Sequence, residues 1–210
     1  VQEIKGVYVP FWLFDGEAEG TVEFRAERVS VTKRGKEEII RTDHYRVMHS
    51  GSLAFEKVPV DASTKMPDEY MDSIEPYDYK ELKPFSTAYL PGFLADKYDV
   101  TVDEGIPRAE IRCQKSFEDA LQARITEYTN VSPVRKDIVL NKGKVHYALL
   151  PVWLLNVNWQ DKTYLFAING QSGRITGAVP AIKQKAVGLF FAVAAALSAI
   201  GGILAWISVL

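Results

Sequence analysis

A short apolar motif occurs twice, once near each end of the charged part of the chain. It reads YVPFWLFD over residues 8–15 and LLPVWLLN over residues 149–156, so that Pro10 matches Pro151 and Trp12 matches Trp153. Proline has no backbone N–H, and within a sheet it is confined to an edge, a first position or a bulge. The repeated proline therefore predicts two β-strands under the same local constraint, with both tryptophans packed inward.

The match continues beyond the turn that follows each motif. Residues 21–26 (TVEFRA) align with residues 162–167 (KTYLFA), and both halves read as an apolar strand, a polar turn and a return strand. This pattern predicts an internal repeat of a β-hairpin unit, one copy before a central helix and one after it. Chance similarity between two hydrophobic strands is the alternative.

Alternating residues around the motifs predict antiparallel sheet on both sides of a different middle segment. Val22, Phe24 and Ala26 alternate with charged residues, which is typical of a half-buried strand. The phase changes at Val29, which predicts a bulge near residues 27–28. We expect a β meander over residues 1–60, a loop-rich acidic and aromatic segment over 61–100, and a second β unit over 130–182.

An amphipathic helix is expected over residues 101–129, with Asp103 as its N-cap. Its apolar stripe recurs every four residues and should face the sheet; it consists of Cys113, Phe117, Leu121 and Ile125. The residues expected to face water are Glu110, Gln114, Glu118 and Gln122.

Residues 186–210 contain no charged side chain. As a helix this stretch would be about 37 Å long, enough for a hydrocarbon core of about 30 Å. It predicts a C-terminal transmembrane helix, with a fully buried core helix as the alternative. The expected fold class is thus α+β: antiparallel β-hairpin units, an amphipathic helix and a transmembrane helix.

The flanks of that stretch predict its orientation. Arg174, Lys183 and Lys185 precede it, and positive residues beside a span favour the cytoplasmic side. We therefore expect a protein of the cell membrane with a single span in this chain and a cytoplasmic soluble part. Small residues let membrane helices approach closely, so Ala195, Ala199 and Gly202 are expected to pack against another span.

Composition and motifs favour no particular chemistry. The net charge of −2 gives no reason to expect a nucleic-acid partner, and the single cysteine, Cys113, cannot form an intramolecular disulfide. There is no phosphate-binding GxxxxGK[ST] loop, no GxGxxG and no HExxH. His44 and His49 fall on opposite faces of a strand, and His146 is remote in sequence, so we expect no metal site from them.

The strongest enzymatic alternative is a set of carboxylates in the middle segment: Asp61, Asp68, Glu69, Asp72, Glu75 and Asp78. Paired carboxylates can perform acid–base catalysis or bind a divalent metal. A solvated acidic face is the competing interpretation, because several of these residues fall on one short exposed turn of helix.

Three segments resemble a known bacterial family: GVYVPFWLFD at 6–15, residues 58–100, and the run from Tyr147 to Pro180, each as it stands in this sequence. They are similar to membrane proteins described as TFIIB-type zinc-ribbon-containing, some of which carry a primosomal-helicase label. No helicase nucleotide motif occurs here, so that label implies no function for this chain. The family's cysteine-rich ribbon precedes the YVPFW block and is absent, which fits a chain that starts at Val1 inside a longer protein.

The resemblance implies that zinc would belong to the upstream ribbon, so no cofactor is expected in this chain. It also implies partners, since some relatives are encoded beside a flotillin-like (SPFH) scaffold and a phage-shock-type protein. We therefore expect a non-enzymatic, membrane-anchored adaptor in an envelope-stress response. The alternative is a hydrolase or metal-dependent enzyme that uses the acidic residues of 61–78.

Overall fold

The computed structural model describes residues 3–35, 37–159, 162–178, 190–194 and 197–198. Its elements are, in order, β1 (Glu3–Arg34), β2 (Glu37–Asp61), α1 (Asp68–Ser73), η1 (Tyr79–Glu81), η2 (Thr87–Tyr89), β3 (Leu94–Ala95), α2 (Val102–Gln122), β4 (Asn130–Trp159), β5 (Lys162–Asn169) and β6 (Ile175–Gly177). The strands β1, β2 and β4 have 32, 25 and 30 residues. They are several times longer than the usual strand of about 5–6 residues.

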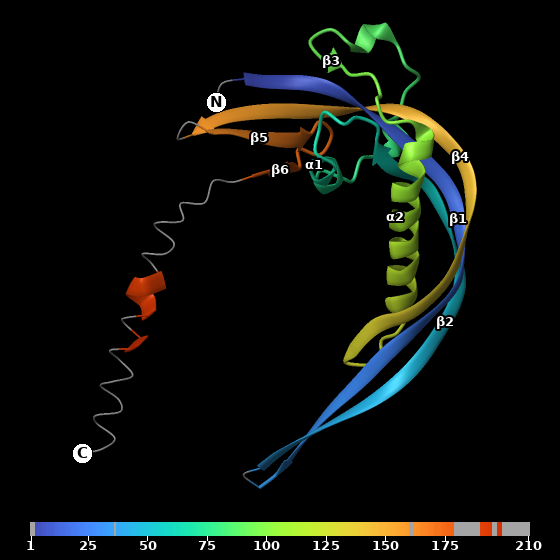
Figure 1. Cartoon of the computed structure of the whole chain (residues 1–210), viewed down its shortest axis with the longest axis vertical. Coiled ribbons are helices and arrows are strands. Elements are labelled where there is room, and N and C mark those ends of the chain that lie inside the picture. Colours follow the sequence, from blue (N-terminus) through green and yellow to red (C-terminus); the bar gives the residue numbers. More distant parts are fainter. Residues whose placement is uncertain (1–2, 36, 160–161, 179–189, 195–196, 199–210) are drawn as a thin grey trace.

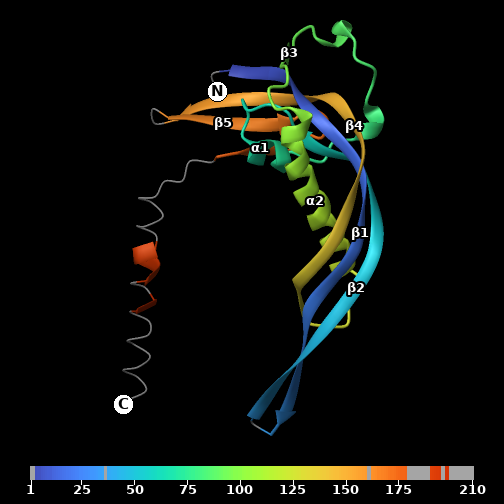
Figure 2. The same ribbon diagram turned by 45° about the vertical axis from the view of Figure 1, so that its right-hand side comes forward.

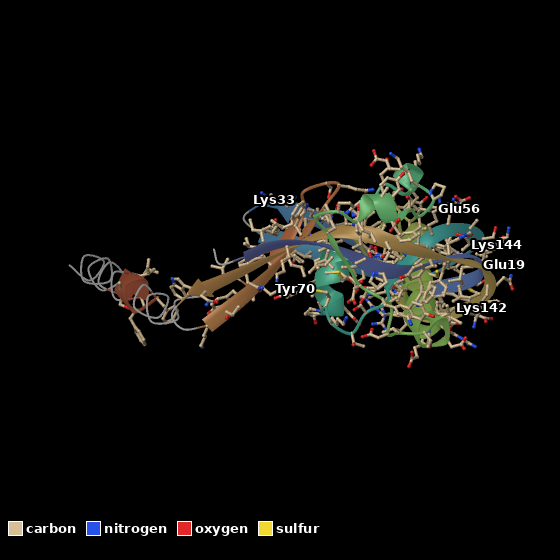
Figure 3. All side chains as sticks on the ribbon, turned by 90° about the horizontal axis from the view of Figure 1, so that it is seen from above. Glu19, Lys33, Glu56, Tyr70, Lys142 and Lys144 are labelled. Atoms are coloured by element: carbon tan, nitrogen blue, oxygen red, sulfur yellow. The ribbon has the colours of Figure 1, made fainter. Side chains whose placement is uncertain are left out.

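These long strands form one curved sheet in the order β2-β1-β4-β5-β6, in which all neighbours are antiparallel. The short β3 pairs in parallel with β1 beyond the end of β2. Both α1 and α2 lie on the concave side of the sheet (Figure 1). The side chains of Glu19, Glu56 and Lys144 lie toward the opposite, convex side (Figure 3).

The sheet bends at one level in its three long strands. The register of β1 with both β2 and β4 shifts between Phe14 and Gly16, which leaves Asp15 in a bulge. Lys57 adopts a positive φ of 56° beside it and donates its N–H to Asp15 Oδ1 at 2.8 Å. A side chain at Gly143 would collide with the Asp15 carbonyl. Bulges bend strands, so this level divides the sheet into two halves that curve around the helices.

Each half has its own buried cluster on the concave side. The half nearer the N-terminus packs Val9, Phe11 and Leu13 of β1 against Met71 and Ile74. The other half packs Ala18, Val22 and Phe24 of β1 against Phe117 and Leu121 of α2. Burying apolar side chains at about 25 cal/mol per Å² is the main stabilising contribution in both.

The helix α2 differs from the expected helix at both ends and at one position. Thr101, not Asp103, caps it: the Thr101 hydroxyl accepts from the Glu104 N–H, and the Glu104 carboxylate accepts from the Thr101 N–H. The helix ends at Gln122, before Ile125. Glu118, expected in water, is only 2% exposed. It forms ion pairs with Lys115 and with Lys136 of β4, which supply the opposite charge that a buried carboxylate needs.

The predicted hairpin repeat fails in its first copy: residues 8–15 and 21–26 lie on the single strand β1, whereas the second copy is the β4–β5 hairpin. The two Pro-x-Trp-Leu motifs lie side by side as antiparallel neighbours in one sheet, with Pro10 opposite Leu149 and Pro151 opposite Tyr8. These two pairings are related by a local two-fold relation about the pair Val9–Leu150. The bulge expected near residues 27–28 is also absent from the β1–β2 pairing, which runs without a shift from Gly16 to Arg34.

The two prolines occupy equivalent places under this relation. The Pro10 carbonyl accepts from the N–H of Ala62, just after β2 ends, and the Pro151 carbonyl accepts from the N–H of Gly170, just after β5 ends. In a strand the N and the carbonyl of one residue point to the same side. The nitrogen of each proline therefore points toward the place where a neighbouring strand ends. The absence of an N–H there removes no hydrogen bond between paired strands.

The expected transmembrane helix over 186–210 requires correction. Within the described ranges, no helix has both the length and the apolar character needed to cross a membrane. Only residues 190–194 and 197–198 of that stretch are described, and Ala195, Ala199 and Gly202 lie outside the described residues. The expected anchor, and with it the expected location as a single-span protein of the cell membrane, is not supported.

Candidate functional site

A groove of about 1030 Å³ lies between the segment 79–97 and the strands β1 and β4. The segment 79–97 carries η1 and η2 and stands off from the sheet beside β3 (Figure 2). Apolar and aromatic groups line much of the groove. They include Tyr8, Leu149 and Leu150 from the strands and Phe85 and Tyr89 from the segment.

Several of these apolar groups are in contact with solvent. Phe85 is 67% exposed and Tyr89 is 49% exposed, and Tyr147 of the strand side is 46% exposed. Scattered apolar side chains are normal on a protein surface, but a grouped set beside a concavity marks a binding site. The volume is at the upper end of the range for small-molecule pockets, about 300–1,000 Å³, and accommodates several residues of an extended chain.

The groove is lined by three lysines and two carboxylates, a small excess of positive charge. Lys57, Lys83 and Lys97 line it, and none of the three ammonium groups lies within 4.0 Å of a carboxylate of the described residues. The two acidic residues of the lining differ from each other. Asp96 is neutralised by Lys65 and also accepts from the Ser63 hydroxyl at 3.2 Å, whereas Glu81 is exposed. A ligand with carboxylates would complement this balance.

A histidine–carboxylate pair lies at one end of the groove, at the bend of the sheet. His146 Nε2 is 3.0 Å from Asp15 Oδ2. The hydrogen bond from the Lys57 N–H, with help from His146, lowers the pKa of Asp15 despite partial burial. The bulge orients this carboxylate, since it leaves Asp15 out of the pairing with both neighbouring strands. The contact with Asp15 fixes the orientation of the His146 imidazole. This ring lines the groove and can form a hydrogen bond there.

The sequence did not reveal this pair. Asp15 and His146 are 131 residues apart, and they meet only because β1 pairs with β4 and both strands are bulged at that level. The sequence shows His146 only as remote in sequence from His44 and His49. The one local signal is Lys142–Gly143, a dipeptide typical of a turn, which lies within β4 at the bend.

The carboxylates of the middle segment are only partly brought together. Asp61, Asp68 and Asp72 surround the guanidinium of Arg108, at 2.5, 3.0 and 2.8 Å. Glu75 and Asp72 both accept from Arg112. The other two take no part: Glu69 is exposed, and Asp78 caps η1 by accepting from the Lys80 N–H.

Burial controls the protonation of two of these acids. Desolvation raises the pKa of Asp61 to about 6, against the opposing effect of Arg108. Desolvation likewise raises the pKa of Glu75, with Arg112 opposing it. Across the described ranges, no group of three or more His, Cys, Asp or Glu side chains is arranged to hold a metal ion. Arg108 and Arg112 supply the positive charge beside these carboxylates.

The repeated tryptophans have different surroundings. Trp12 donates its indole N–H to the Val100 carbonyl at 2.9 Å and packs against Tyr98 and Tyr147. Trp153 packs against Phe93 and is 37% exposed. Trp12 lies opposite Tyr147, whereas Trp153 lies opposite Gly6, and Phe93 fills the space that a side chain at Gly6 would take. Both rings help to fix the segment 93–100 that borders the groove.

Comparisons with known proteins identify one informative similarity. No family model matches the chain, and no solved structure matches it. The chain is 37% identical over 194 residues, or 92% of its length, to a protein of Bacillus subtilis (strain 168) described as "Uncharacterized protein YdjG". The similarity therefore extends over nearly all of this chain, which spans 57% of the length of that relative.

Proposed function

We propose that this chain is a non-enzymatic protein-binding module, and that its groove takes an apolar segment of a partner protein that also carries carboxylates. The observation that carries the proposal is the grouping of exposed aromatic side chains with lysines in one groove. Phe85 and Tyr89 offer apolar contact, and Lys83 and Lys97 offer positive charge beside it. Buried aromatic contacts supply most of the binding energy at protein interfaces, and charges supply orientation and specificity.

The contacts of the acidic segment support this function over the hydrolase alternative. A general acid or base must reach a substrate, and a metal ligand must have free oxygen atoms. Asp61 is 2% exposed and Arg108 is held against it, while Arg112 is held against Glu75. These carboxylates join α1 to α2, which is a structural role.

The proposed partners are an SPFH scaffold and a phage-shock-type protein, on the basis of the family resemblance. The test is to measure binding of each purified protein to the full chain by isothermal titration calorimetry at low salt. Replacing Lys83 and Lys97 together with glutamate should weaken binding at least tenfold, because like charges would then face the partner's carboxylates. Replacing Phe85 with alanine should weaken it through lost apolar contact.

A matched control carries the same change in net charge elsewhere. Lys33 lies near the far end of the β1–β2 hairpin and Arg124 follows α2, and both are exposed. Replacing these two with glutamate should leave the affinity unchanged. The proposal is wrong if the groove variant binds as tightly as the control variant, or if neither candidate protein binds the wild-type chain.

A further inference from the structure

The hairpin of β1 and β2 extends well beyond the rest of the sheet. Pairing between β1 and β4 ends at Glu27 and Asn130, whereas β1 and β2 remain paired as far as Arg34 and Glu37. Residues 28–34 and 37–43 therefore form a two-stranded arm, which projects from the end of the sheet farthest from the groove segment (Figures 1 and 2). A hairpin of two strands is marginally stable in water unless something further packs on it.

The outer edge of this arm is open. β2 is the last strand of the sheet on its side, so its outward N–H and C=O groups have no strand partner among the described residues. Edge strands are usually protected from pairing with another chain by a proline, a bulge or charged side chains, lysine above all. In β2 such features, the positive φ at Lys57 and Pro59, lie at the opposite end. Residues 37–47 contain no proline, bulge or lysine, and their charged residues are of both signs, so an oppositely charged strand can pair with them.

Large apolar side chains are exposed on this same stretch. Ile40 is 65% exposed, Ile39 is 49% exposed and Tyr45 is 38% exposed. Because successive residues of a strand point to opposite faces, Ile39 and Tyr45 lie on one face and Ile40 on the other. An edge that is both open and apolar on two faces is a template for an added strand.

The sequence of the edge is complementary to itself. When two copies of β2 pair antiparallel about a two-fold axis at Thr42, Arg41 lies opposite Asp43 of the other copy, and Glu38 lies opposite Arg46. Each such pair joins opposite charges, and the two-fold axis produces each pair twice. Opposite charges across strands stabilise pairing and like charges directly opposite weaken it.

Neighbouring registers lack this complementarity. An axis perpendicular to the sheet must pair residues of the same face, so the axis passes through a residue. Moving it by one residue places it at Arg41 or at Asp43, and either choice sets two like charges directly opposite each other. The register at Thr42 also sets Ile39 beside Tyr45 and Ile40 beside His44, so that the exposed apolar groups cover one another.

We propose that residues 37–47 of β2 pair antiparallel with the same residues of a second copy of this chain, with Thr42 on the two-fold axis. The two arms then form a four-stranded antiparallel sheet. Arg46 already contacts Glu23 at 2.8 Å and gains Glu38 of the second copy as another acceptor. This inference is independent of the proposed function, because the arm and the groove lie at opposite ends of the sheet.

The first test exchanges charges on the full chain, kept in a mild detergent because residues 186–210 are uncharged. Sedimentation analysis of the wild type should show a reversible monomer–dimer equilibrium. Arg41→Asp places two carboxylates opposite each other and should weaken the dimer at least tenfold. Adding Asp43→Arg restores opposite charges between positions 41 and 43 of the two copies. It also restores the ion pair that these two positions form within one chain. The double variant should therefore regain the dimer. Circular dichroism checks that each variant folds.

The second test reads the register directly by cross-linking in a Cys113→Ala background. Thr42→Cys places two thiols across the axis and should give a covalent dimer with a short bismaleimide. Ser52→Cys lies on the same face of the same strand, but the two thiols would be roughly 60 Å apart along extended strands, so it should not cross-link. The proposal is overturned if the wild type is monomeric throughout the concentration series, if Arg41→Asp dimerises as the wild type does, or if both cysteine variants cross-link equally.

Discussion

Asp61 and Asn169 are corresponding residues of the local two-fold relation. Asp61 ends β2 opposite Phe11, and Asn169 ends β5 opposite Val152, the counterpart of Phe11 in the second motif. Both side chains are buried, at 2% and 1% exposure. They satisfy their polar groups differently: Asp61 pairs with Arg108, and the Asn169 amide donates to the carbonyls of Ile74 and Pro76. The same position in the sheet is thus ionisable in one half and neutral in the other.

Replacing Asp61 with asparagine should change how stability depends on pH. The pKa of Asp61 is raised from 3.8 to about 6 in the folded chain, chiefly by burial, so the folded chain binds this proton more tightly than the unfolded chain. The resulting contribution to stability is complete below pH 3.8 and is lost as the pH rises through about 6. The free energy of unfolding of the wild type, relative to Asp61→Asn, should therefore fall on the order of 3 kcal/mol from pH 4 to pH 7.

The measurement is urea unfolding across that range. Asp68 also contacts Arg108 but is well exposed, so Asp68→Asn should retain the wild-type slope. Identical slopes for the wild type and Asp61→Asn would contradict the assignment.

Arg112 should be important for stability because its partner is buried. Replacing it with methionine leaves the Glu75 carboxylate, whose side chain is 14% exposed, without its main counter-charge. Leaving one partner of a buried pair alone costs about 3–5 kcal/mol. Chemical denaturation checks this value, and Arg124→Met, at an exposed site, is the control. Adding Glu75→Gln should recover part of the loss, and no recovery would argue against the ion pair as the cause.

The two tryptophans should contribute unequally. Trp12→Ala removes a ring with two aromatic neighbours and a hydrogen bond to Val100, and should cost about 3–5 kcal/mol. Trp153→Ala removes a ring that is 37% exposed and should cost less, about 1–2 kcal/mol. Equal losses in thermal or urea unfolding would show that the local two-fold relation extends to the energetics of these sites.

Cys113 should react slowly with thiol reagents in the folded chain. The side chain is half-buried in α2, and burial raises the pKa of its thiol, so little thiolate is present at neutral pH. The rate of labelling should increase steeply above pH 8 and should be far higher in urea. A rate in buffer equal to the rate in urea would place Cys113 on the surface.

The sequence predicted burial correctly where the local hydrophobic period alone decides which side chains are buried. The period-four stripe of Phe117 and Leu121 predicts the buried face of α2, and these two residues are buried. The same pattern misplaced Glu118, because its burial depends on Lys136 of β4, a partner that periodicity cannot show. The phase change at Val29 was interpreted as a bulge, but this part of the hairpin has no third strand, so neither face must be apolar.

The groove and the bend depended on long-range register, which the sequence does not display. The repeated motif identified two related strands, yet it could not show that they pair with each other. That pairing creates the contact between Asp15 and His146 and the alignment of three bulged strands. The positions of Arg108 and Arg112 opposite the acidic segment likewise follow from how α2 crosses the sheet.

The pairing of β1 with β4 has a consequence for biosynthesis. β2 follows β1 directly in the sequence, whereas β4 begins only at Asn130. While the residues between β1 and β4 are being synthesised, β1 has β2 as a neighbour but lacks β4. At about 5–20 residues per second, this interval lasts roughly 5–20 seconds. During that time Val9, Phe11 and Leu13 have no partner from β4, and the nascent chain presents an apolar strand to the cell. We expect a ribosome-bound chaperone to contact residues 7–14 and to be released once the whole of β4, up to Trp159, has left the exit tunnel.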